Sequence, residues 1–390
     1  MRSGALLASL MVLLVFSGAC GESLDGQEGS SEQAWQWNLP PGFPKPKVPA
    51  DNPMSEAKVQ LGRHLFYDKR LSGNETQSCA GCHQQDQAFT DGRGRALGST
   101  DELHPRGSMT LTNVAYGSTF NWGNPVVTSL RRQPLTPMFG ENPVELGLER
   151  RPQVLDRLRA SQSPDYRSMF RRAFSEADGE SPVTLDRITK ALAAFERTLI
   201  SANSPFDDYM YRGREDALTD SQKRGMELFF SERLECFHCH GGFNFADATE
   251  HAGSSFEARK FHNNGLYNVD GEGAYPEGNQ GVYEVSGDPA DRGRFKATTM
   301  RNVAVTAPYM HDGSIETLEG VIDHYARGGR LVESGPYAGD GKESPLKSEL
   351  IDGFVISERE KQDLIHFLES LTDRQFLEAE RFSNPFEVAE

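Results

Sequence analysis

Cysteine is scarce in this sequence: five residues among 390 are too few for a disulfide scaffold. Positive charge is also under-represented, with 41 Lys and Arg against 57 Asp and Glu and a formal net charge of −16. This balance argues against a nucleic-acid partner, because a phosphate backbone is held by clustered Lys and Arg. After the first residues, no apolar run reaches the roughly 20 residues that cross a bilayer. With 37% apolar residues, the composition predicts a folded protein.

Residues 1–19 predict an export signal. Arg2 precedes an apolar run from Ala5 to Phe16, and small residues follow, which is the order found in a cleaved signal peptide. Cys20 comes next, and the segment resembles a bacterial lipoprotein signal in which this cysteine is lipidated. The alternative is an ordinary cleaved signal in which Cys20 has no role. Either way we expect a periplasmic or cell-envelope protein that contacts the membrane only through a lipid on Cys20.

The remaining chain favours helices. Residues 20–52 are acidic and then Pro-rich, which predicts an extended tether. Beyond them, Ser55 and Ser357 are placed to cap helices. Few segments alternate as strands do, so the expected fold class is mainly α with little β. The segments with clear helical features are 153–172, 184–201, 219–230 and 357–371.

A Gly-x-x-Leu-Phe motif occurs twice, beginning at Gly62 and at Gly225. Each copy precedes a pair of closely spaced cysteines, so each half of the chain combines a helix with a cysteine motif. This repetition is typical of a duplicated domain. We expect two domains after the tether, at 53–210 and 211–390.

Every cysteine except Cys20 falls in one of two CxxCH motifs. Two thiols three positions apart can bond to the two vinyl groups of one haem, and the adjacent His becomes the proximal iron ligand. A zinc site would need four ligands gathered from both motifs, and a redox CxxC does not need the trailing His. The motifs therefore predict two covalently bound haems c. Their residues are Cys79, Cys82 and His83, and Cys236, Cys239 and His240.

The opposite face of each haem decides the function. A haem with two strong protein ligands carries electrons, whereas a haem with an open face can bind and cleave peroxide. Met, His and Tyr side chains are all candidates for the second ligand, and the residues alone do not distinguish them.

The stretch 294–329, RFKATTMRNVAVTAPYMHDGSIETLEGVIDHYARGG, resembles the signature of the bacterial di-haem cytochrome c peroxidase/MauG family. The terminal ISEREKQDLIHFLESLTD is similar to the last helix of that family, and the runs 111–122 and 137–147 look most like its MbnH-like branch. The resemblance implies two packed cytochrome c-like domains. The N-terminal domain would react with peroxide and the C-terminal domain would store electrons.

The resemblance makes the haem on His83 the one that reacts with peroxide. Gln133, Pro137 and Glu145 match the Gln, Pro and Glu of the family's distal pocket. A carboxylate there can take a proton from peroxide and return it to the departing oxygen, so Glu145 would be the acid–base group and Gln133 an orienting group. Without the resemblance, Glu145 reads as a solvated carboxylate in a loop.

Tyr325 stands where MauG relatives place the distal ligand of the second haem, which is bound by His240. Met310 is the rival ligand, because Met has this role in other di-haem peroxidases. A phenolate oxygen favours Fe(III) and higher states, and a thioether favours Fe(II). The resemblance favours Tyr325, whose alternative role is that of a core aromatic residue.

Trp122 matches the tryptophan that the family places between its two haems; otherwise it would be a large core residue. Thr306 and Pro308 match a pair whose carbonyls hold a calcium ion in the family, although Gly107 replaces the Asn that accompanies them. The resemblance thus implies a possible third metal site.

The function implied is a peroxidase that uses hydrogen peroxide to form a high-valent di-haem state. That state would oxidatively modify an aromatic residue, such as tryptophan, of an exported copper-binding partner protein. A second prediction is a detoxifying cytochrome c peroxidase that takes electrons from a small cytochrome. A third is a non-catalytic di-haem electron carrier.

Overall fold

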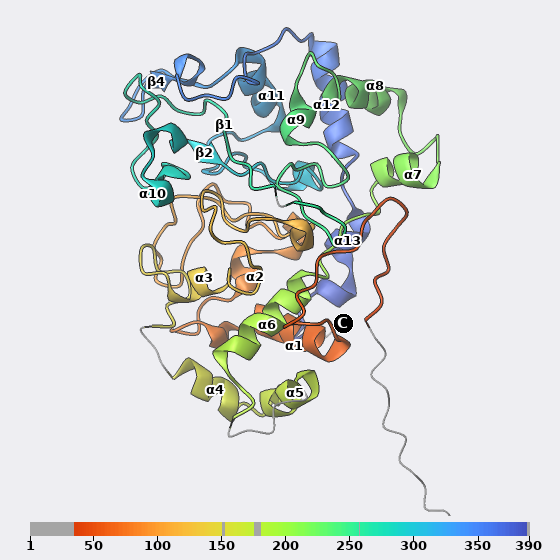
Figure 1. Cartoon of the computed structure of the whole chain (residues 1–390), viewed down its shortest axis with the longest axis vertical. Coiled ribbons are helices and arrows are strands. Elements are labelled where there is room, and N and C mark those ends of the chain that lie inside the picture. The colour runs from red at the N-terminus through yellow and green to blue at the C-terminus, as the bar shows by residue number, and fades with distance from the viewer. Residues whose placement is uncertain (1–34, 150–152, 175–180, 257, 388–390) are drawn as a thin grey trace, which may run out of the picture. The chain divides into compact units, whose positions relative to one another are not determined.

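The computed structural model describes residues 35–149, 153–174, 181–256 and 258–387. The predicted signal peptide and Cys20 lie outside these residues. Within them, no helix has the length and apolar character needed to pass through a membrane. Most regular structure is helical and the strands have two residues each, so the mainly α prediction is confirmed (Figure 1).

The helices are α1 (Glu56–Tyr67), α2 (Cys79–Cys82), α3 (Leu135–Phe139), α4 (Val154–Ala160), α5 (Tyr166–Ala173), α6 (Leu185–Glu196), α7 (Pro205–Arg212), α8 (Asp220–Phe229), α9 (Cys236–Cys239), α10 (Tyr283–Ser286), α11 (Leu318–Arg327), α12 (Glu358–Glu369) and α13 (Arg374–Glu378). Strand β1 (His262–Asn263) pairs antiparallel with β2 (Arg294–Phe295), with His262 opposite Phe295. Strand β3 (Leu331–Val332) pairs antiparallel with β4 (Gly339–Asp340).

Both predicted helix caps are present. The Ser55 side chain accepts a hydrogen bond from the third residue of α1, and Ser357 forms a complete capping box with Glu360 at the start of α12. The single helix expected over 153–172 is wrong, because α4 ends at Ala160 and α5 begins at Tyr166. Pro164 lies in the break, where its ring and missing N–H oppose a continuous helix.

The repeated glycines have the same packing role in both halves. Helix α1 crosses α6, and α8 crosses α12 (Figure 1). A Cβ atom on Gly62 would lie 2.0 Å from the carbonyl oxygen of Ala191, and one on Gly225 would lie 1.9 Å from that of Asp363. Only glycine permits such an approach of two helix backbones. The sequence repeat is therefore also a repeat of one helix crossing.

Each crossing has its own cluster of buried apolar side chains. The first includes Leu65, Phe66 and Phe195, and the second includes Phe229 and Phe367. The chain end returns to the first half, because Phe376 and Phe382 belong to the first cluster. The domain bounds 53–210 and 211–390 stay a prediction.

The described part of the predicted tether contacts the fold. Trp35 and Trp37 pack against the first cluster. Phe43 is buried, with its ring centroid 5.2 Å from that of Phe243 and 6.5 Å from that of Tyr116. From Trp35 onward the Pro-rich segment is thus held by aromatic contacts, although it contains no regular element.

Candidate active site

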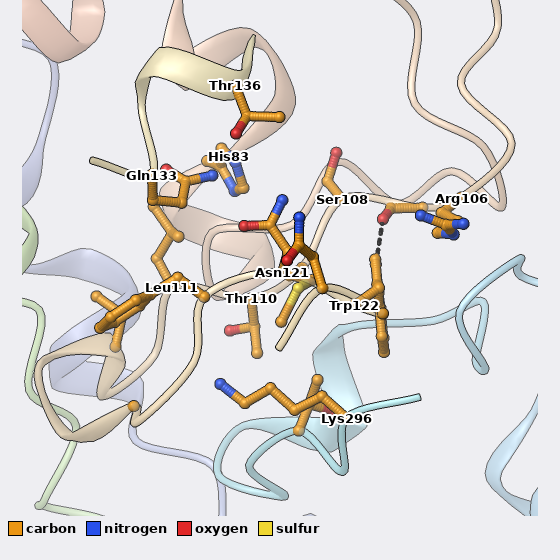
Figure 2. A pocket seen from close by; sticks show the side chains of 18 of the residues that line it. His83, Arg106, Ser108, Thr110, Leu111, Asn121, Trp122, Gln133, Thr136 and Lys296 are labelled. Atoms are coloured by element: carbon orange, nitrogen blue, oxygen red, sulfur yellow. Dashed lines mark hydrogen bonds between the residues drawn. The ribbon is translucent and has the colours of Figure 1, made fainter. Parts of the chain in front are cut away.

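A first cavity of about 310 Å³ gathers residues from both halves of the sequence. His83 and Cys82 come from the end of α2, and Gln133, Pro137 and Glu145 come from α3 and its flanking loops. Figure 2 shows His83, Gln133 and Trp122 around this space. The structure therefore brings His83 together with the predicted distal residues Gln133, Pro137 and Glu145.

His83 follows α2 directly, and its ring is fixed by the backbone. Nδ1 lies 2.8 Å from the carbonyl oxygen of Phe89, which can only accept, so Nδ1 donates. Burial lowers the pKa of His83, which keeps the ring neutral. Nε2 then carries the lone pair, as a metal-binding imidazole requires. This site fits the predicted proximal haem ligand.

A second cavity of about 250 Å³ lies beside α9 and is lined by Cys236, Cys239 and His240. His240 Nδ1 lies 3.2 Å from the carbonyl oxygen of Phe245 and 3.1 Å from that of Thr298. Burial lowers the pKa of His240 too, so its Nε2 is also suited to a metal. Because each cavity is lined by cysteine and histidine side chains of one CxxCH motif, each fits one covalently attached haem.

Glu145 is a partly buried acid. About a third of its side chain is exposed, and burial raises its pKa to about 7. Oε1 lies 3.9 Å from Nε2 of His104. The other ring nitrogen of His104 accepts the backbone N–H of Arg106 at 3.1 Å, so the proton sits on Nε2. Burial, followed by the charge of Arg106, lowers the pKa of His104 to about 4, and the ring is neutral.

The Glu145 loop is held in place from two sides. Its backbone carbonyl accepts the N–H of Ser99 at 2.8 Å. The next residue, Leu146, donates its N–H to the carbonyl of Pro137 at 2.8 Å. Pro137 therefore links the loop to α3, and Ser99 links it to the loop that carries His104. No sequence pattern marks His104, because this pairing depends on two loops 40 residues apart.

Trp122 lines both cavities. Its indole N–H donates to the carbonyl of Gly107 at 2.8 Å (Figure 2). Its own carbonyl accepts the N–H of Lys296 at 2.8 Å. Lys296 also lines both cavities, and burial lowers its pKa to about 8. Lys296 lies within the 294–329 signature, but sequence reasoning gave it no role because a single Lys does not reveal its contacts with distant residues.

The two rival ligands of the second haem lie in the same cavity as His240. Tyr325 projects from α11, and burial raises its pKa to about 12. Met310 lines the cavity with a backbone φ of +71°, an uncommon value for a non-glycine residue. Asn264 donates an N–H to Met310 Sδ at 3.2 Å. Position alone leaves Tyr325 and Met310 as alternatives.

Thr306 and Pro308 line the second cavity. The Thr306 hydroxyl donates to the carbonyl of Val303 at 3.0 Å. Gly107, which replaces the Asn of the calcium pattern, uses its carbonyl to accept the Trp122 indole N–H. The calcium site stays a prediction.

Comparisons with known proteins agree with this geometry. Residues 56–216 match the family described as di-haem cytochrome c peroxidase. A methylamine utilization protein MauG of Methylorubrum extorquens is 33% identical over 356 residues, covering 91% of this chain and 89% of the relative. A cytochrome-c peroxidase IdrP1 of a Pseudomonas species is 34% identical over 349 residues, covering 85% and 86%.

A crystal structure described as a MauG-like protein associated with microbial copper homeostasis is 47% identical, with a TM-score of 0.87. It covers 91% of this chain and 100% of the other. Members of this family are di-haem oxidoreductases, and the two CxxCH motifs supply the attachment points for two c-type haems. Because relatives above 30% identity extend over most of its length, the chain belongs to the di-haem cytochrome c peroxidase/MauG family.

Proposed function

We propose that this enzyme uses hydrogen peroxide to oxidise a tryptophan of an exported copper-binding partner protein. The observation that carries the proposal is the position of Trp122 in the walls of both cavities, between the His83 side and the His240 side. A connection of this kind allows two haems to share oxidising equivalents. The 47% identical protein associated with copper homeostasis supports a partner of the copper-binding class.

In the cavity lined by His83, a bound haem would supply the iron that binds peroxide and is oxidised by it. Glu145 is the catalytic acid–base residue: its carboxylate takes the proton from peroxide and returns it to the departing oxygen. A pKa near 7 suits both steps. Gln133 orients the peroxide through its amide, and Pro137 anchors the Glu145 loop through its carbonyl.

On the second side, Tyr325 and His240, which line the same cavity, are the residues that would hold the haem iron. A hard, anionic phenolate oxygen stabilises an oxidised metal better than a thioether does. Tyr325 is buried in the cavity wall, and burial outweighs its side-chain hydrogen bond with Asn264 and raises the pKa of the phenol to about 12. The phenolate would form when a metal cation takes the place of the proton.

Electron sharing between the sides is the role of Trp122. Its indole N–H is bound to a neutral carbonyl, that of Gly107, which fixes the ring without providing a base. Trp122 can thus pass one electron at a time and keep its proton. Lys296 is buried beside Trp122. A second positive charge in the wall between the two cavities is unfavourable next to this buried amine.

A detoxifying cytochrome c peroxidase is the second candidate. The observation in its favour is the Met310 sulfur in the cavity of His240, since thioether ligation favours Fe(II) and acceptance of electrons from a reduced cytochrome. Relatives named cytochrome-c peroxidase are as similar to the chain as those named MauG.

Two further elements belong to the proposal. The mature protein begins at Cys20 with a lipid anchor at the cell envelope, which mass spectrometry of the purified N-terminus tests. The carbonyls of Thr306 and Pro308 would hold a calcium ion, a hard cation that prefers oxygen ligands. Elemental analysis of the holoprotein before and after chelation tests this, and absence of stoichiometric calcium removes the ion from the mechanism.

The deciding experiment is a peroxide titration of the oxidised holoprotein without reductant. We expect an immediate optical change in both haems, followed by mass-shifted tryptophan in a copper-binding partner encoded nearby. A protein that stays silent until it is first reduced by one electron, and then oxidises a small cytochrome, is instead the detoxifying peroxidase.

A further inference from the structure

Aromatic rings form a row from the wall between the cavities to the surface. Trp122 packs against a buried cluster that contains Tyr267 and Tyr275. Centroid distances along the row are 6.5 Å for Trp122 and His311, 6.2 Å for His311 and Tyr275, 5.5 Å for Tyr275 and Tyr267, and 6.2 Å for Tyr267 and Tyr337. All lie in the usual range of aromatic contacts. The four ring contacts therefore form a continuous aromatic path from Trp122 to Tyr337.

The row ends at an exposed tyrosine. Tyr337 is 45% exposed, whereas Tyr267 and Tyr275 are 7% and 2% exposed. Tyr337 lies in the loop between β3 and β4, and β4 lies at the edge of the molecule in Figure 1. A docked protein could bring an aromatic side chain against its ring without entering either cavity.

One tyrosine of the row has a base for its proton. The Tyr267 hydroxyl donates to Oδ2 of Asp312 at 2.7 Å and accepts from the Arg330 guanidinium at 3.2 Å. The other oxygen of Asp312, Oδ1, accepts the backbone N–H of Ser314 at 3.1 Å, so both oxygens of this group act as acceptors. Asp312 is therefore a carboxylate. This matters because a neutral tyrosine is oxidised readily only when its proton can leave.

The neighbouring tyrosine lacks such a base. Tyr275 donates its hydroxyl to the side-chain oxygen of Asn263 at 2.8 Å and accepts the N–H of Leu266 at 3.1 Å. An amide oxygen does not take a proton at neutral pH. Tyr275 and His311 therefore only connect Trp122 to Tyr267 without being oxidised themselves. Tyr267 is the residue that can be oxidised to a radical.

We propose that Tyr267, with Asp312 as its proton acceptor, and Tyr337 form the exit through which oxidising equivalents reach a protein partner docked at the β3–β4 loop. The inference rests on the proposed function and names the surface at which that function is carried out. The partner is one that presents an oxidisable aromatic side chain on its own surface.

The steps balance. Tyr267 gives one electron toward Trp122 and its phenolic proton to Asp312. Tyr337 then gives one electron to Tyr267, which regains its proton from Asp312, and the Tyr337 proton passes to water. Without a partner, Tyr337 radicals of two copies couple through a new carbon–carbon bond. Two tyrosines and one hydrogen peroxide then yield one dityrosine and two waters.

The test uses the di-haem holoprotein and hydrogen peroxide with no partner present. We expect a Tyr337–Tyr337 cross-link, measured as a covalent dimer by electrophoresis and as a dityrosine peptide by mass spectrometry. Y337F should abolish it, and Y267F and D312N should each lower its yield at least tenfold. Y283F is the matched control, because Tyr283 is a partly exposed tyrosine outside the row, and it should leave the yield unchanged.

Haem content and the first optical response to peroxide are measured in every variant. An intact response with equal cross-linking in Y267F and wild type overturns the exit and leaves the proposed function standing. A wild-type protein that responds optically but never oxidises Tyr337 also overturns the exit and leaves the proposed function standing. A wild-type protein with both haems and no optical response overturns the proposed function and the exit together.

Discussion

His104 and Glu145 face one another in the first cavity, with Nε2 and Oε1 3.9 Å apart. The backbone N–H of Arg106 occupies the other nitrogen of His104, so the ring presents its N–H to the carboxyl group. Because this ring is neutral and lies beyond hydrogen-bonding distance, it places no charge beside Glu145 that would depress the pKa of the carboxyl group. The arrangement leaves Glu145 able both to take and to return a proton.

The reaction with peroxide should depend on pH through Glu145. Its raised pKa, about 7, means that the carboxyl is protonated below pH 7 and cannot accept the peroxide proton. The second-order rate constant should rise about tenfold per pH unit below 7 and level off above it. Stopped-flow spectroscopy of the holoprotein from pH 5 to 9 measures this. E145Q should be slower by about 10² to 10⁴-fold and lose the profile; an unchanged profile in E145Q contradicts the assignment.

Trp122→Phe should separate the two haems. Both haems should remain attached, because Trp122 belongs to neither CxxCH motif. The optical response of the His240 haem to peroxide should disappear. Partner oxidation should fall with it. Trp37→Phe is the control, since Trp37 packs on the first cluster outside both cavities. If the His240 haem of W122F responds to peroxide as it does in the wild type, the oxidising equivalents reach that haem by a route other than Trp122.

Tyr325→Phe and Met310→Leu distinguish the two ligands. We expect Y325F to change the optical and paramagnetic spectra of the oxidised His240 haem, because the phenolate oxygen is lost. M310L should leave those spectra unchanged while removing the contact with Asn264. The reverse outcome assigns the thioether as ligand and favours the detoxifying peroxidase.

The glycine crossings should be intolerant of a methyl group. Gly62→Ala and Gly225→Ala place Cβ about 2 Å from a carbonyl oxygen, which forces the helices of each pair apart. Each should lower the free energy of unfolding by about 1–3 kcal/mol or more, measured by urea unfolding. Gly253→Ala, whose Cβ would meet nothing closer than 3.4 Å, is the control and should change it by no more than about 0.5 kcal/mol.

Features that depend on neighbours in the chain were predictable. Haem attachment follows from the spacing of Cys79, Cys82 and His83, and the caps at Ser55 and Ser357 follow from residues three positions away. The break before Tyr166 was also visible in Pro164, but the helical period around it concealed the effect.

Features that depend on the meeting of distant loops were not predictable. His104 lies near Glu145 because the backbone N–H of Ser99 is hydrogen-bonded to the Glu145 carbonyl. Lys296 lines both cavities because its backbone N–H is hydrogen-bonded to the Trp122 carbonyl. Tyr267 and Asp312 are separated by 45 positions, and although Asp312 lies within the 294–329 signature, nothing in the sequence pairs it with Tyr267. Such pairs are products of packing, and periodicity or composition carries no trace of them.

The return of the chain end to the first cluster has a consequence for biogenesis. Phe376 and Phe382 complete a core built mostly from the first 200 residues, and Gln85, two positions after His83, donates to the carbonyls of Phe376 and Ala379. The N-terminal core cannot close until almost the whole polypeptide has been delivered. We therefore expect Cys79 and Cys82 to stay accessible for haem attachment until the chain end packs against the first cluster.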